Sequence, residues 1–201
     1  MKLDPFYPIV ETPDWVERLV KLGVRTLQLR AKDLDDVQAL KVVSDSLKLC
    51  EGHDVQLIIN DYWGAAIDLG ADWLHLGQGD LATADMAAIK KAGLKLGLST
   101  HDHAELETAL KHDPDYIALG PVYHTTLKEM PWQPQGMDRV REWKGLINCP
   151  LVAIGGITLE RADEVWAAGA DSLSVVTDIV FNDNPDQRTT DWLNWAETKR
   201  T

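Results

Sequence analysis

The chain is poor in cysteine, in positive charge and in long apolar runs. Its two cysteines, Cys50 and Cys149, stand far apart and form no CxxC motif or Cys/His cluster. We interpret them as reduced, partly buried thiols of a cytoplasmic protein. No apolar run approaches the length that spans a bilayer, and the opening residues, Met1 to Pro5, do not resemble a signal peptide. We therefore expect no membrane partner.

Acidic residues outnumber basic ones, and the net charge is −12. This balance excludes a general nucleic-acid surface, which needs a basic face. A phosphate-bearing ligand is not excluded, but a few placed cations, backbone N–H groups or a metal must then hold the phosphate. With 201 residues, 45% of them hydrophobic, the chain can bury one substantial core, and we predict a single domain over residues 1–201.

Short apolar runs rich in β-forming residues alternate with segments of helical periodicity. The predicted strands are Tyr7–Val10, Thr26–Leu29, Val55–Ile59, Trp73–Leu76, Leu94–Leu98, Tyr116–Leu119, Leu151–Ile154 and Ser172–Val176. A candidate helix follows each strand, and roughly 25 residues per unit fits an α/β fold of the (β/α)8 TIM-barrel type. The alternative, a doubly wound open sheet, needs a glycine-rich fingerprint after the first strand, and Glu11 to Asp14 is not one.

Two helix starts and one long loop stand out. Thr12-Pro13 and Asn184-Pro185 each predict a capping side chain followed by proline at the first helical position. The connection from Gly120 to Gly136 is rich in proline, threonine and glutamine. It follows the sixth strand, where barrels place active-site loops.

Two neighbouring apolar strands each end in a carboxylate, at Asp61 and Asp80. Because both strand ends of a parallel strand–helix–strand unit emerge at the same edge, we expect these carboxylates to lie side by side. Such a pair suits Mg²⁺, which takes few protein ligands and shares its remaining positions with phosphates. The alternative is that each aspartate only caps the helix that follows it.

Polar residues or glycines end strands two to eight in turn, at the rim where a barrel carries its chemistry. On strand two, a period of two places Gln28, Arg30 and Lys32 on one side. The other strands end in Asn60-Asp61, Gln78 and Asp80, Ser99 to His101, Thr125, Thr126 and Lys128, Gly155-Gly156, and Thr177-Asp178. Any one could be a cap or a turn, but together they indicate a single site that handles anions with a metal.

The last two strand ends predict a phosphate site. Gly155-Gly156 lets the backbone approach a ligand closely, and Val176 to Ile179 can begin a short helix whose N–H groups face an anion. A tight turn before the helix at Thr158 is the alternative for the glycines. Asp178 would repel a phosphate there unless its side chain turns outward.

The six histidines form no metal site. His75 lies within an apolar strand, where we predict a hydrogen-bonded core residue. Ser99 has His101 nearby but no aspartate to complete a triad, so nucleophilic catalysis is disfavoured. A Ser99 hydroxyl that hydrogen-bonds a phosphate fits better. His124, in the long loop, has no assigned role.

Seven short motifs stand at the predicted strand ends. They are Gln28-Leu-Arg-Ala-Lys32, Ile59-Asn-Asp61, His75-Leu-Gly-Gln-Gly-Asp80, Gly97-Leu-Ser-Thr-His101, Gly120-Pro-Val-Tyr-His-Thr-Thr-Leu-Lys128, Ala153-Ile-Gly-Gly-Ile157 and Val175-Val-Thr-Asp-Ile179. In this order they resemble the thiamine phosphate synthase family, over almost the whole chain from Tyr7 to the last helix.

This resemblance implies a transferase of thiamine biosynthesis with Mg²⁺ as cofactor. Its small-molecule substrates would be 4-amino-2-methyl-5-hydroxymethylpyrimidine diphosphate and a thiazole phosphate, carboxylated or not, and pyrophosphate would leave in a dissociative step. Asp61 and Asp80 would hold the metal, and self-association into a homo-oligomer is left open. The catalytic residues would be Arg30, Lys32, Ser99 and Lys128. The substrate-binding residues would be Gln28, Leu29, Arg30, Ala31, Lys32, Asn60, Ser99, Thr125, Thr126, Leu127, Lys128, Gly156, Val176 and Thr177.

The chain departs from the family pattern at Leu127 and Asp178, both on the side implied for the thiazole phosphate. The nearest alternative is the thiazole tautomerase branch of the same family. That branch usually has a histidine after the strand-six glycine, where this chain has Pro121, and tends to lose the metal-binding carboxylates. The other alternative is a non-catalytic thiamine-phosphate-binding protein with a decayed site.

Overall fold

The fold is a closed barrel of eight parallel strands in sequential order, which confirms the predicted (β/α)8 architecture. The computed structural model describes residues 3–125 and 132–200. The strands are β1 (Phe6–Val10), β2 (Thr26–Leu29), β3 (Gln56–Asn60), β4 (Trp73–Leu76), β5 (Lys95–Thr100), β6 (Tyr116–Leu119), β7 (Leu151–Ile154) and β8 (Ser172–Val175). Pairing of β1 with β8, for example Phe6 with Leu173, closes the ring. That the whole chain is one domain stays a prediction.

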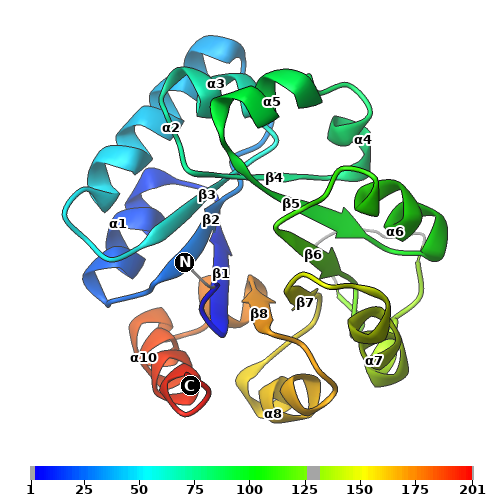
Figure 1. The fold of residues 1–201 in the computed structure, drawn as a ribbon. Coiled ribbons are helices and arrows are strands. Elements are labelled where there is room, and N and C mark those ends of the chain that lie inside the picture. Colours follow the sequence, from blue (N-terminus) through cyan, green and yellow to red (C-terminus); the bar gives the residue numbers. More distant parts are fainter. Residues whose placement is uncertain (1–2, 126–131, 201) are drawn as a thin grey trace.

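Helices surround the strands on the outside of the barrel (Figure 1). They are α1 (Pro13–Lys21), α2 (Asp36–Cys50), α3 (Trp63–Asp68), α4 (Gln78–Leu81), α5 (Met86–Ala92), α6 (His103–Leu110), α7 (Gly136–Leu146), α8 (Leu159–Ala167), α9 (Thr177–Val180) and α10 (Pro185–Glu197). Both predicted helix starts are confirmed: Thr12 accepts a hydrogen bond from the Trp15 N–H, and Asn184 accepts one from Gln187. Among the described residues, no helix has both the length and the apolar character to cross a membrane.

Two predicted strands are shifted toward their carboxyl ends. β3 begins at Gln56 and includes Asn60, because Asn60 pairs with His75 of β4. β5 runs from Lys95 to Thr100, because Ser99 and Thr100 pair with β6. Asn60 and Ser99 are therefore held by strand backbone rather than by loops.

The barrel interior is filled by a small apolar cluster of its own. Its members are Leu3, Tyr7, Ile58, Trp73, Tyr116, Ala118 and Val152, separate from the larger core that lies between strands and helices. The Tyr116 ring is fully buried and packs directly against Gly97 on the neighbouring strand β5. A Cβ atom at Gly97 would lie 2.0 Å from Cζ of Tyr116, so only glycine leaves room for this ring.

Replacing Gly97 with alanine should therefore destabilise the barrel. Overpacking against a rigid ring typically costs about 1–3 kcal/mol of unfolding free energy, which urea denaturation would measure. Gly64→Ala is the matched control, because nothing lies within 4 Å of a Cβ built at that helical position. Equal stability of the two variants would show that the Tyr116 ring is not confined by Gly97.

Candidate active site

A cavity of about 610 Å³ opens at the carboxyl ends of the strands. Residues on or just after all eight strands line it, as expected for a site at this rim of a barrel. The lining residues are Ile9, Glu11, Gln28, Arg30, Lys32, Asn60, Asp61, His75, Gly77, Gln78, Gly79, Asp80, Ser99, His101, Glu105, Gly120, Pro121, Thr125, Trp132, Ile154, Gly155, Gly156, Ile157, Ser174, Val176 and Thr177.

Asp61 and Asp80 form a carboxylate pair in this cavity. Burial raises the pKa of Asp61 to about 6, and the Asp80 carboxyl beside it adds to the rise, while the Asn60 amide and Arg30 oppose it. Neither aspartate caps the following helix. Tyr62, not Asp61, is the N-cap of α3, and that helix has no side-chain cap. Asp80 lies within α4, and the helix after it, α5, is capped by Asp85. The capping interpretation is thus wrong for both residues.

This pair has the character of a site for a hard divalent cation. Two carboxylates held close together repel each other, and a cation between them would relieve that repulsion. In the described part of the chain, no group of three or more His, Cys, Asp or Glu side chains gathers as a metal site. A donor set of two carboxylates fits Mg²⁺, which keeps several waters or phosphate oxygens as ligands.

Side chains at the end of strand β2 alternate between the cavity and the buried core, as the predicted period of two requires. Gln28, Arg30 and Lys32 line the cavity. Leu29 packs in the outer core and Ala31 is buried, so neither side chain is part of the lining. A substrate-binding role for these two residues stays a prediction. Arg30 lies near enough to Asp61 to lower the pKa of that carboxyl.

The loop after β6 is described in part. Thr125 lines the cavity, whereas Thr126, Leu127 and Lys128 lie outside the described residues. The roles predicted for these three residues therefore stay predictions.

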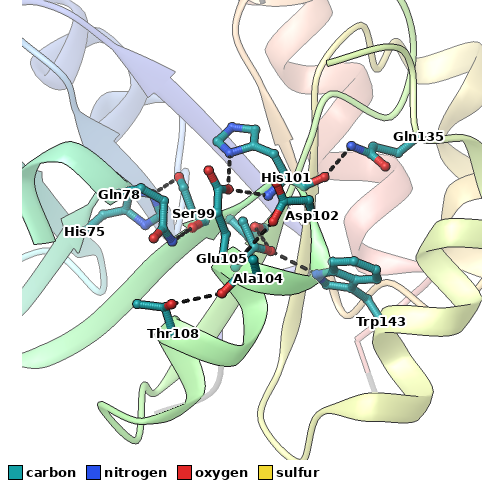
Figure 2. A network of polar contacts seen from close by, with 12 residues as sticks. His75, Gln78, Ser99, His101, Asp102, Ala104, Glu105, Thr108, Gln135 and Trp143 are labelled. Carbon is teal, nitrogen blue, oxygen red and sulfur yellow. Dashed lines mark hydrogen bonds and ion pairs between the residues drawn. The ribbon is translucent and has the colours of Figure 1, made fainter. Parts of the chain in front are cut away.

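Ser99 is fixed from two sides (Figure 2). Its hydroxyl lies 2.8 Å from Nε2 of His75, and its carbonyl accepts a hydrogen bond of 2.6 Å from the Gln78 amide. His75 is buried, as predicted, and its Nδ1 lies 2.8 Å from the Tyr116 hydroxyl. His101 instead bonds to Glu105, at 2.7 Å from Nδ1. Neither ring nitrogen of His75 contacts a carboxylate of the described residues, so Ser99 and His75 do not form a triad.

Gly155 and Gly156 make both a tight turn and a close backbone approach. Their φ angles are +101° and +64°, a region that side chains other than glycine rarely adopt. A Cβ at Gly155 would lie 2.7 Å from Cα of Pro121, and one at Gly156 would lie 2.4 Å from the carbonyl oxygen of His124. The glycines thus allow the end of β7 to pass against the loop after β6, and both line the cavity beside Val176 and Thr177.

Asp178 does turn outward. Its carboxylate accepts hydrogen bonds from Nε and Nη2 of Arg188, at 2.8 and 2.9 Å, and from Nε1 of Trp192 at 2.7 Å. Its side chain is only 9% exposed, so this ion pair is largely shielded from water. The departure from the family pattern at Asp178 therefore adds no negative charge to the cavity lining.

Several lining residues were not predicted from the sequence, among them Glu11, Glu105 and Trp132. Glu11 follows β1 directly, so the rule applied to the other strand ends would have found it. Glu105 lies one helical turn beyond His101 and accepts its backbone N–H. His101 and Trp132 stack with ring centroids 4.0 Å apart and form one wall. That contact joins two loops, and no local sequence pattern indicates it.

Comparison with known proteins gives one consistent result. The family model described as thiamine monophosphate synthase matches residues 7–179. A thiamine-phosphate synthase of Rhizobium etli is 58% identical over 96% of this chain and 95% of its own length. One from Neisseria meningitidis serogroup A is 48% identical over 90% and 89% of the two chains. The solved thiamine phosphate pyrophosphorylase of Pyrococcus furiosus superposes with a TM-score of 0.85 at 22% identity, over 98% and 96% of the chains, which supports the fold.

Since Asp178 pairs with Arg188 and Trp192, Asp178→Ala should affect stability rather than the cavity. Loss of this shielded carboxylate should lower the free energy of unfolding by about 2–4 kcal/mol, measured in urea. Activity per folded molecule should be unchanged. Asp186→Ala, which breaks an exposed ion pair with Arg18, is the control and should cost less than about 1 kcal/mol. Lost activity at full stability would instead place Asp178 in the site.

Proposed function

The chain belongs to the thiamine monophosphate synthase family, and we propose that the cavity at the strand ends is where it carries out thiamine-phosphate synthesis. This activity is a transferase reaction of thiamine biosynthesis. A pyrimidine diphosphate loses pyrophosphate, and the ring nitrogen of a thiazole phosphate bonds to the methylene carbon that remains. The observation that carries the proposal is the carboxylate pair of Asp61 and Asp80, which faces the same cavity as Arg30 and Lys32.

The pyrimidine diphosphate would bind on the side formed by β2 to β5. Arg30 and Lys32 would hold the diphosphate oxygens, and Asn60 and Ser99 would donate hydrogen bonds beside them. Mg²⁺ held by Asp61 and Asp80 would supply Lewis-acid charge next to the leaving group. Fixed positive charge favours departure of pyrophosphate because negative charge grows on its oxygens as the C–O bond breaks.

The thiazole phosphate would bind on the opposite side, where β7 and β8 end. Gly156, Val176 and Thr177 line the cavity there, and Thr125 comes from the loop after β6. This placement would set the thiazole nitrogen against the carbon from which pyrophosphate leaves. One C–O bond breaks and one C–N bond forms, so no serine nucleophile or strong general base is required. Thr126, Leu127 and Lys128 remain predicted contributors, Lys128 at the leaving group.

No observation favours either alternative function. Both carboxylates predicted to hold the metal face the cavity, and Pro121, where the tautomerase branch has histidine, lines it. A carrier with a decayed site would have no need to keep Arg30, Lys32 and the two aspartates in one cavity. A cytoplasmic location and self-association into a homo-oligomer stay predictions.

The purified chain should release pyrophosphate only when the pyrimidine diphosphate, the thiazole phosphate and Mg²⁺ are all present. A coupled pyrophosphate assay measures this, and excess EDTA should abolish the release until Mg²⁺ is restored. Thiazole phosphate and its carboxylated form should be compared as substrates. No release with any combination, while thiazole phosphate still binds, would favour the tautomerase or the carrier.

Asp61→Asn should lower this activity by roughly two orders of magnitude, because one charged ligand of the metal is lost. Asparagine tolerates the left-handed backbone of Asp61, whose φ is +64°, so the fold should remain intact by circular dichroism. Asp113→Asn is the matched control, since Asp113 also has a positive φ of 51° but is exposed and lies outside the cavity lining. Full Mg²⁺-dependent activity of Asp61→Asn would contradict the assignment of Asp61 as a metal ligand.

A further inference from the structure

A continuous row of hydrogen bonds crosses the barrel interior and ends at the cavity. The Gln28 amide donates to the Tyr7 hydroxyl at 2.7 Å, and Tyr7 and Tyr116 are joined through their hydroxyls at 2.9 Å. The Tyr116 hydroxyl lies 2.8 Å from Nδ1 of His75, and Nε2 of His75 lies 2.8 Å from the Ser99 hydroxyl. The first four residues are buried, and Ser99 lines the cavity.

The two tyrosine hydroxyls determine the direction of this row, that is, which group donates and which accepts in each hydrogen bond. Each hydroxyl must place one proton in a hydrogen bond, because a buried O–H without an acceptor is costly. Tyr7 already accepts from Gln28, so its proton goes to Tyr116, and the Tyr116 proton then goes to Nδ1 of His75. Burial raises the pKa of both phenols, so both protons stay in place at neutral pH.

The protonation of the His75 ring determines which way the hydrogen bond to Ser99 runs. Both ring nitrogens contact hydroxyls, and because the Tyr116 hydroxyl donates to Nδ1, the ring is neutral. A neutral imidazole that accepts at Nδ1 carries its proton on Nε2. That proton is donated to the Ser99 oxygen, and the proton of Ser99 itself is left for a group in the cavity.

We propose that Gln28, Tyr7 and Tyr116 are positioning residues that hold His75 in the Nε2–H tautomer. His75, itself a positioning residue, then turns the Ser99 proton toward a diphosphate oxygen. The inference rests on the proposed function, which puts the diphosphate beside Ser99. If every hydrogen bond ran the other way, Ser99 would donate to His75. Its oxygen lone pairs would then face the anion and repel it. The Gln78 amide on the Ser99 carbonyl fixes the backbone and leaves only the hydroxyl proton to be set (Figure 2).

The far end of the row also reaches the cavity. Gln28 lines it, and Oε1 of its amide has no hydrogen-bond partner among the described residues. This oxygen is itself buried, so the Gln28 amide is held in the row through its nitrogen, which donates to Tyr7.

The direction is tested by side-chain ¹⁵N NMR of histidine-labelled protein without ligand. The His75 resonances are assigned from their absence in His75→Gln. We expect Nε2 of His75 to be protonated and Nδ1 to be unprotonated at neutral pH. A proton on Nδ1 in the wild-type protein would overturn the inference.

Two substitutions of His75 test the consequence for anion binding, with inorganic pyrophosphate and Mg²⁺ as the calorimetric probe. Glutamine can place an amide N–H where Nε2 was, whereas asparagine reaches only the position of Nδ1. We expect His75→Asn to weaken pyrophosphate binding on the order of tenfold or more, as Ser99→Ala does, because a hydrogen bond to a charged group is lost. His75→Gln should bind within a few-fold of the wild type.

Equal binding by His75→Asn and the wild type, or equal losses in the two His75 variants at matched urea stability, would contradict a positioning role. Neither the NMR nor the binding experiment uses the condensation reaction. Absence of turnover would therefore count against the proposed function alone, and a proton on Nδ1 would count against the direction of the row alone.

Discussion

The constraint on which the site depends is that a parallel barrel brings the carboxyl ends of all its strands to one rim. Asp61 and Asp80 follow adjacent strands, so the barrel holds two carboxylates together that would separate in a flexible chain. The raised pKa of Asp61 reflects that confinement and its burial. A cation held by this pair would relieve the repulsion, so the same confinement supports the proposed metal site.

The cavity of this acidic protein suits an anionic substrate because the charges of the protein are distributed unequally. Arg30 and Lys32 line the cavity, while Asp178, in the short helix α9 after β8, is turned away and neutralised by Arg188. Glu105 remains in the lining but accepts two hydrogen bonds from His101. The net charge of −12 is therefore a property of the surface as a whole, and local cations decide what the cavity accepts.

The fold and most of the lining could be predicted because both follow from short-range periodicity. Alternating apolar runs indicated eight strands, and a period of two separated Gln28, Arg30 and Lys32 from Leu29 and Ala31. The remaining features depend on contacts between distant segments. Tyr7 meets Tyr116 across 109 positions, His101 stacks on Trp132, and Asp178 finds Arg188 on a different helix. No local pattern encodes such partners, so His75 could be predicted as a hydrogen-bonded core residue but not as the link to Ser99.

The most direct measurement is anomalous diffraction from a crystal of the protein soaked with Mn²⁺ and inorganic pyrophosphate, with Mn²⁺ in place of Mg²⁺. A metal role for the paired carboxylates predicts one strong anomalous peak between Asp61 and Asp80, with pyrophosphate oxygens completing its coordination and Arg30 on the phosphates. A peak elsewhere in the cavity, or pyrophosphate bound without metal near these aspartates, would contradict that role. The barrel would then hold the two carboxylates together for another purpose.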